Sequence, residues 1–165
     1  MATVNSRIIG PLNEDNQFTY WWKSEPVEVP FFDGERMPVT FMNYAPDDDP
    51  AFMDEADAAL ENFLGFGEAE REATSAQVYA NCIEFLNGTT TDEFDAPMLQ
   101  MEDAGEVWQF VYPTDIFVSR HPDTHVLYLQ VACECEWNQE HGLQLVFKQG
   151  RELTRVSAQD GESGE

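Results

Sequence analysis

Hydrophobic and polar side chains alternate along the stretch that begins at Leu127. The apolar set is Leu127, Leu129, Val131, Cys133, Cys135 and Trp137. Because side chains two residues apart point to the same face of a strand, this period predicts a long β-strand with one buried face. Shorter runs at 143–147 and 152–156, each preceded by turn residues, predict two further strands. We interpret residues 124–156 as the scaffold of a sheet.

Two segments have the period of a helix instead. Apolar residues recur at spacings of three and four between about residues 49 and 65 and between about residues 70 and 87. This spacing predicts two amphipathic helices. Asp49 followed by Pro50 predicts an N-terminal cap for the first helix. Asn87 and Gly88 predict the end of the second.

Short strand-like runs between residues 18 and 42 precede these helices. The order of strands, two helices and strands is typical of the α+β class, here an antiparallel sheet with both helices packed on one face. Residues 1–157 are predicted to form one domain. Residues 1–16 lack periodicity, which predicts a loosely ordered start. The segment 158–165 has nothing to bury and is predicted to be a disordered acidic tail.

The net charge of the chain limits the classes of partner that we expect it to bind. The 165 residues include 32 acidic residues and 8 Lys or Arg, a formal net charge of −24. Contacts with phosphate groups need cations, so this charge argues against binding to nucleic acid or to an anionic membrane. The chain opens without the pattern of a signal peptide and contains no apolar run long enough to cross a bilayer. We therefore expect a cytoplasmic protein.

The negative charge is concentrated before residue 120. Residues 1–119 hold 24 acidic and 4 basic residues, whereas residues 120–165 hold 8 and 4. A surface of one sign attracts partners of the opposite sign. Two interpretations fit this pattern: a site for a basic protein partner and, more simply, a solvated face that keeps the protein soluble.

Cys133 and Cys135 have the spacing that places two sulfur atoms on one face of a strand. With His141 they form a candidate zinc site, but a closed zinc site needs four ligands and no second Cys or His pair is present. Free cysteines are also among the most buried residues. We therefore favour packing in the core, and no cofactor is expected.

Glu140 and His141 lie at the predicted turn between two strands, where functional residues often occur. A carboxylate beside an imidazole is a candidate acid–base pair for a small hydrolase or a metal-dependent enzyme. No nucleophile stands in a recognisable motif near it. The alternative is that His141 anchors the turn by hydrogen bonds while Gly142 supplies an unusual backbone angle.

The opposite face of the long strand supplies a candidate binding surface. Tyr128, Glu134 and Glu136 alternate with the apolar set and are predicted to project away from the core. An exposed Tyr128 would lie at the centre of this surface. The simpler alternative is a solvated face on which Arg151 and Arg155 pair with the two glutamates across the sheet.

The segment from Trp137 to Leu143 reads Trp, two residues, then Glu-His-Gly-Leu. This signature resembles a bacterial family of uncharacterised domains, and the segments 108–113 and 115–120 are similar to it as well. The resemblance covers roughly residues 26–157 and implies a small α+β domain without an established activity. Its members are similar in style to small acidic proteins encoded near toxins, which implies an immunity-like role by analogy.

We therefore expect a non-enzymatic bacterial interaction protein whose acidic surface binds a basic protein. The alternative is a small enzyme that uses Glu140 and His141. The sequence does not specify an oligomeric state.

Overall fold

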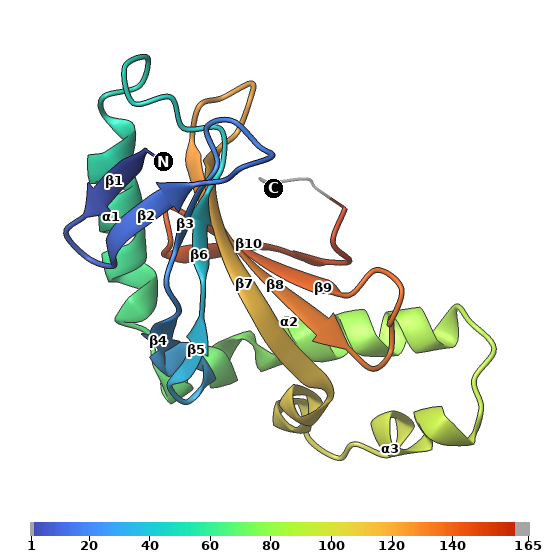
Figure 1. The fold of residues 1–165 in the computed structure, drawn as a ribbon. Coiled ribbons are helices and arrows are strands. Elements are labelled where there is room, and N and C mark those ends of the chain that lie inside the picture. The colour runs from blue at the N-terminus through green and yellow to red at the C-terminus, as the bar shows by residue number, and fades with distance from the viewer. Residues whose placement is uncertain (1, 161–165) are drawn as a thin grey trace.

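The computed structural model describes residues 2–160 and shows a mixed α/β fold built on a large, mostly antiparallel sheet (Figure 1). Eight of its strands form one sheet in the order β1-β2-β3-β6-β7-β8-β9-β10. They span Thr3–Ser6, Gly10–Glu14, Trp22–Ser24, Val39–Phe41, Val111–Arg120, Leu127–Cys135, Leu143–Lys148 and Glu152–Ser157. Strands β4 (Val27–Val29) and β5 (Glu35–Met37) pair separately. The long strand predicted from the alternation is β8, which lies between β7 and β9.

The segment 1–16, predicted to be loosely ordered, contains strands β1 and β2. Strands β1 and β2 pair in antiparallel register and extend the sheet beyond β3. Asp57, buried on helix α1 (Phe52–Leu64), accepts a hydrogen bond from the Ser6 hydroxyl and another from the Arg7 backbone N–H at 3.3 Å. This hairpin is thus held by a contact between residues about fifty positions apart, which periodicity does not reveal.

One strand pair departs from the antiparallel prediction. Strands β6 and β7 run parallel, with Val39 opposite Ile116 and Phe41 opposite Val118. A parallel pair needs a long crossover connection. Residues 42–110, which contain all the α-helices of the described chain, provide it.

The two predicted helices are present with shifted starts. They are α1 and α2 (Glu68–Asn87), followed by the short α3 (Ala96–Leu99). The 3-10 helices are η1 (Pro30–Phe32), η2 (Glu93–Asp95) and η3 (Ala104–Phe110). Asp49 does not cap α1, whose N-cap residue is Ala51. Its carboxylate binds Arg120 at the end of β7 instead, at 2.5 Å. A partly buried cation, rather than the helix N-terminus, therefore binds this carboxylate.

The hydrophobic core joins α1, α2 and one face of β8. Its members include Ala56, Leu60 and Phe63 of α1, Val78 and Cys82 of α2, and Leu127, Leu129, Val131 and Cys133 of β8. Full burial of each larger side chain contributes about 1.5–3 kcal/mol to the stability of the fold.

Helix α1 also packs closely against the turn between β9 and β10. A Cβ atom on Gly150 would lie 2.0 Å from the backbone oxygen of Ala59. Gly150 also has φ +71°, so both contact and conformation require glycine there.

The end of the described chain is bound to the sheet. Residues 158–160, at the start of the segment predicted to be a disordered tail, include two that bind the sheet through their side chains. The side-chain amide of Gln159 donates to the Cys133 carbonyl at 2.8 Å, and Asp160 pairs with Arg155 at 2.5 Å. The rest of the predicted tail, residues 161–165, lies outside the described residues.

Among residues 2–160, no helix combines the length and hydrophobicity needed to cross a bilayer.

Candidate functional site

Glu140 and His141 lie in the turn between β8 and β9, as predicted, but both side chains are exposed. The relative exposures are 86% for the glutamate and 62% for the histidine, and the carboxylate oxygen is 3.9 Å from the imidazole Nε2. The backbone of His141 is fixed, since its N–H donates to Asn138 Oδ1 and its carbonyl accepts from the Gln159 N–H. Gly142 has φ +67°. These contacts are those of a turn anchor, and neither side chain lines the cavities described below.

The three cysteines are buried in the core. Burial raises the pKa of Cys82 to about 12 and that of Cys135 to about 11, and it raises the pKa of Cys133 as well. These thiols stay protonated at neutral pH, whereas thiolates are the species that bind metals. Within residues 2–160, no group of three or more His, Cys, Asp or Glu side chains is arranged to hold a metal ion. Cys133 and Cys135 therefore pack in the core, away from the exposed ring of His141.

The residues predicted to form a binding surface on the other face of β8 differ in exposure. Tyr128 is only 5% exposed, so the prediction of an exposed tyrosine at the centre of this face is wrong. Its ring lies against His121, with centroids 6.4 Å apart. Glu134 is exposed, and Glu136 accepts a hydrogen bond from the Tyr112 hydroxyl at 2.6 Å, which raises the pKa of Tyr112.

The predicted ion pairs across this face are also absent from the described residues. Strand β10 pairs with β9 rather than with β8, so Arg155 lies one strand too far from Glu134 and Glu136 and binds Asp160 instead.

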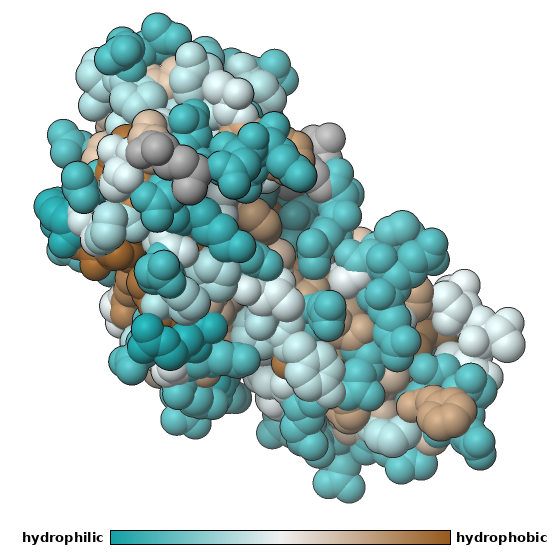
Figure 2. Space-filling model, viewed as in Figure 1, coloured by the Kyte–Doolittle hydropathy of each residue, from teal (hydrophilic) through white to brown (hydrophobic). Residues whose placement is uncertain are grey.

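The acidic surface has a distinct protrusion, which we call the acidic arm and define as residues 88–103. It follows α2, contains η2 and α3, and lies at one end of the molecule (Figure 1). The arm contains five acidic residues and no Lys or Arg: Asp92, Glu93, Asp95, Glu102 and Asp103. The side chain of Phe94 is 78% exposed among them. Figure 2 shows a hydrophobic side chain that stands out from the hydrophilic surface in this region.

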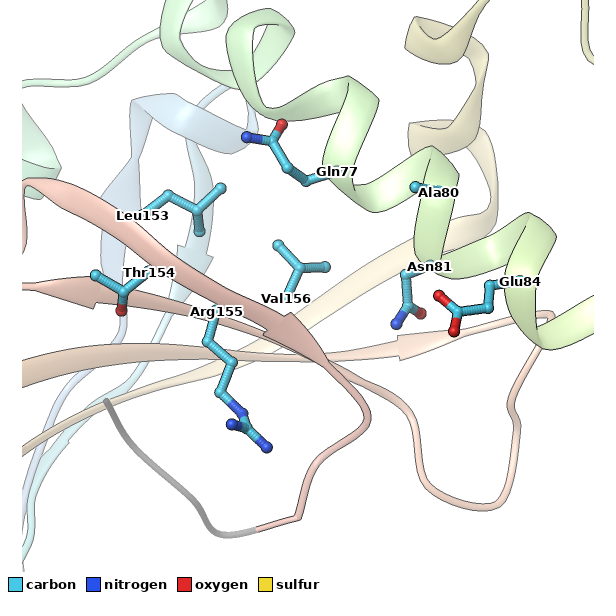
Figure 3. A pocket seen from close by; sticks show the side chains of 8 residues that line it. All are labelled: Gln77, Ala80, Asn81, Glu84, Leu153, Thr154, Arg155 and Val156. Carbon is cyan, nitrogen blue, oxygen red and sulfur yellow. The ribbon is translucent and has the colours of Figure 1, made fainter. Parts of the chain in front are cut away.

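A groove of about 310 Å³ separates α2 from β10 (Figure 3). Leu153 and Val156 point toward the helix, whereas the guanidinium of Arg155 points away from it. The amide oxygen of Asn81 accepts a hydrogen bond from the indole of Trp137 at 3.0 Å. Asn81 is thus used to hold α2 against the loop after β8.

A second hollow, of about 480 Å³, opens on the face of β7, β8 and β9 opposite the hydrophobic core. We call it the amide cleft because Asn43, Gln130, Gln144 and Gln159 all line it. Its other lining residues are Trp21, Met42, Phe117, Ser119, Arg120, Pro122 and Ala132. The strand register places four residues side by side on the floor of the cleft, since Phe117 pairs with Gln130 and Ala132 pairs with Gln144. The neighbours of these residues along each strand face the core.

Arg120, at the edge of this cleft, is held by several hydrogen bonds from its guanidinium group. Its guanidinium donates to both oxygens of Asp49, to Glu55 and to the His125 carbonyl. The hydrogen bonds to Glu55 and Asp49 raise the pKa of Arg120. The charge is therefore neutralised by α1 and by the loop before it, and Arg120 joins β7 to α1.

Sequence patterns did not predict the amide cleft because its residues come from six separate segments. Phe94 could have been noticed, since it is an isolated aromatic residue within an acidic, cation-free run. The burial of Gln130 could not have been predicted from the sequence, because it depends on the loops that surround this face of the sheet.

Comparison with known proteins places the chain in a family without indicating an activity. Searches of the curated proteins and of the solved structures found no match. A family model matches residues 8–163, which includes nearly all of the sheet and every helix described above. The chain therefore belongs to the family described as a domain of unknown function, DUF6985.

Proposed function

We propose that this protein is a non-enzymatic interaction protein of the immunity-like kind, which captures a basic protein partner through the acidic arm. The observation that carries the proposal is the exposure of Phe94 within a segment that has five acidic residues and no cation. Large exposed aromatic side chains are costly in water and are typical anchors of protein interfaces.

The distribution of cations strengthens the argument. Arg7, Arg36, Arg71, Arg120 and Arg155 each pair with a carboxylate of this chain. Between Arg71 and Arg120, by contrast, nine acidic residues occur and no Lys or Arg. The negative field of this part of the molecule is therefore not compensated locally, and it favours a partner of opposite charge.

The arm is built to hold Phe94 in place. The Phe94 backbone N–H donates to Asp92 Oδ1 at 2.9 Å, and the Asp92 N–H donates to Asp95 Oδ2 at 3.0 Å. Met98 of α3 is buried in the hydrophobic core and anchors the arm. A side chain whose backbone is already ordered loses less entropy on binding, which is the property of an interface anchor.

The proposal is tested by affinity capture with the purified chain and two double variants. The arm variant is Glu93→Gln with Glu102→Gln, because no described hydrogen bond uses either carboxylate. The matched control is Asp47→Asn with Asp48→Asn, which removes two exposed charges from the loop before α1. We expect a basic protein to bind the wild type and the control, and to bind the arm variant about tenfold more weakly.

Two results contradict the proposal. One is equal weakening of capture by both double variants, which would indicate a nonspecific effect of net charge. The other is a captured protein without an excess of Lys and Arg. If the captured protein is a toxin, co-expression with this chain should restore growth of the host cells, and the arm variant should restore less.

A further inference from the structure

The amide cleft lacks the charge that dominates the rest of the molecule. None of its lining residues is Asp or Glu, although 32 of the 165 residues are acidic. Its one cation, Arg120, is held by Asp49 and Glu55. A ligand that fits this cleft is therefore uncharged, because the walls offer no free charge to offset the loss of hydration of an ion.

Gln130 supplies an amide that no other described residue engages. The residue is 7% exposed and lines the cleft, and its side-chain amide makes no hydrogen bond to any residue between 2 and 160. Its neighbours across the floor, Phe117 and Val146, offer no polar side-chain atom. The Gln130 amide reaches solvent within the cleft, because Arg71 Nε is the one buried side-chain polar atom of the described residues without a partner. It is therefore available to a hydrogen-bonding group of a bound ligand.

The rim adds a fixed aromatic surface. The Trp21 indole N–H donates to Asn43 Oδ1 at 3.2 Å, and Phe18 stacks against the indole with ring centroids 4.8 Å apart. The Tyr44 N–H donates to the Tyr20 carbonyl at 2.9 Å, which ties the two rim loops together. The indole that lines the cleft is therefore ordered before any ligand binds, which favours binding.

From this juxtaposition of amides, a fixed indole and no free charge, we propose that the amide cleft binds a neutral, hydroxyl-rich ligand the size of a mono- or disaccharide. A carboxamide presents donors and an acceptor in one plane, and it matches neighbouring hydroxyl groups, which also donate and accept. The indole matches the apolar face of a sugar ring. The volume of about 480 Å³ lies within the range of small-molecule sites.

A nucleoside shares part of this chemistry, since its base stacks on aromatic rings and pairs with amides. The sugar is favoured because amides lie on both the floor, at Gln130 and Gln144, and the rim, at Asn43, although Gln144 Nε2 already donates to Ser157 and Asp160 and Asn43 Oδ1 accepts from Trp21. This spread suits hydroxyl groups around a ring better than the single polar edge of a base.

Titration of the full chain, followed by NMR, tests the proposal. The probes are glucose, galactose, mannose, N-acetylglucosamine and their common disaccharides, with adenosine, uridine and glucuronate as comparison ligands. We expect saturable shifts of the Trp21 indole N–H and of the Gln130 side-chain amide with at least one neutral sugar. Gln130→Ala should weaken this affinity about tenfold, whereas Tyr112→Ala, an exposed aromatic residue outside the cleft, should leave it unchanged.

Each other outcome overturns the proposal. No shift at these two groups with any neutral sugar would mean that solvent alone pairs with Gln130. Tighter binding of a nucleoside or of glucuronate would assign the cleft to another class of ligand. Equal weakening by Gln130→Ala and Tyr112→Ala would place the binding elsewhere. A fold check by the amide spectrum of each variant separates these outcomes from unfolding.

Discussion

The acidic arm and the amide cleft are opposite in the property that dominates this chain. The arm has five carboxylates, no cation and an aromatic side chain that projects into solvent. The cleft has no carboxylate, and its aromatic ring is held by neighbours. The net charge of −24 is therefore distributed unevenly between these two sites. A surface for a charged partner and a site for an uncharged ligand can coexist when the fold keeps the carboxylates out of one hollow.

The first way to test this contrast is to compare adjacent residues of β8. Leu129 faces the core and is fully buried, whereas Gln130 faces the cleft. Leu129→Ala should lower the free energy of unfolding by about 2–5 kcal/mol, because it leaves a cavity. Gln130→Ala should lower it by less than about 1 kcal/mol, since the amide has no partner to lose. Urea unfolding measures both. Equal losses would mean that the cleft face is ordinary core.

This pair of residues also shows how far the sequence could predict the fold. Alternation along β8 identified Leu129 as a core residue, because hydrophobic burial follows strand period. It misjudged Tyr128, which is buried on the opposite face against His121. That burial depends on contacts between distant segments, as does the bond between Ser6 and Asp57 that orders the N-terminal hairpin. Local pattern carries no information about either contact.

The candidate sites were less predictable than the fold. The concentration of acid before residue 120 indicated the kind of partner, and the arm lies within that region. The motif residues Glu140 and His141 proved to be exposed at a turn. The cleft has no sequence signature, because Trp21, Gln130 and Gln159 meet only through sheet register and loop packing.

The second prediction concerns the arm. Phe94→Ala should weaken binding of the captured basic partner by about 2 kcal/mol, the typical loss at an interface anchor. Because the side chain is exposed, the same substitution should change the free energy of unfolding by less than about 0.5 kcal/mol. Calorimetric titration and urea unfolding measure the two values. A large loss of stability would assign Phe94 to packing and would contradict its proposed role.

The third prediction tests whether the core beneath helix α2 is sealed from solvent. Burial raises the pKa of Cys82 from 9.0 to about 12, so the folded protein favours the protonated thiol. The resulting stabilisation is complete below pH 9 and is lost as the pH rises toward 12. The urea midpoint should therefore fall over this range, and it should fall less steeply in Cys82→Val. Equal slopes in both proteins would mean that Cys82 titrates normally and is accessible.

The smallest expected effect is the influence of salt on the cleft. An uncharged ligand should bind the cleft with an affinity that changes less than about twofold when salt is raised from about 0.05 M to about 0.5 M. The NMR titration repeated at both concentrations measures this. A loss of affinity comparable to that at the arm would show that a charged group contributes to the cleft after all.

The measurement that tests the central claim most directly is the salt dependence of the affinity between this chain and its captured partner. Screening shortens the range of electrostatic attraction from about 14 Å at 0.05 M salt to about 4 Å at 0.5 M. If the acidic arm captures a basic protein, the dissociation constant should rise about tenfold or more over this range, and the rise should be smaller in Glu93→Gln with Glu102→Gln. A dissociation constant that does not change with salt would contradict capture by the acidic arm.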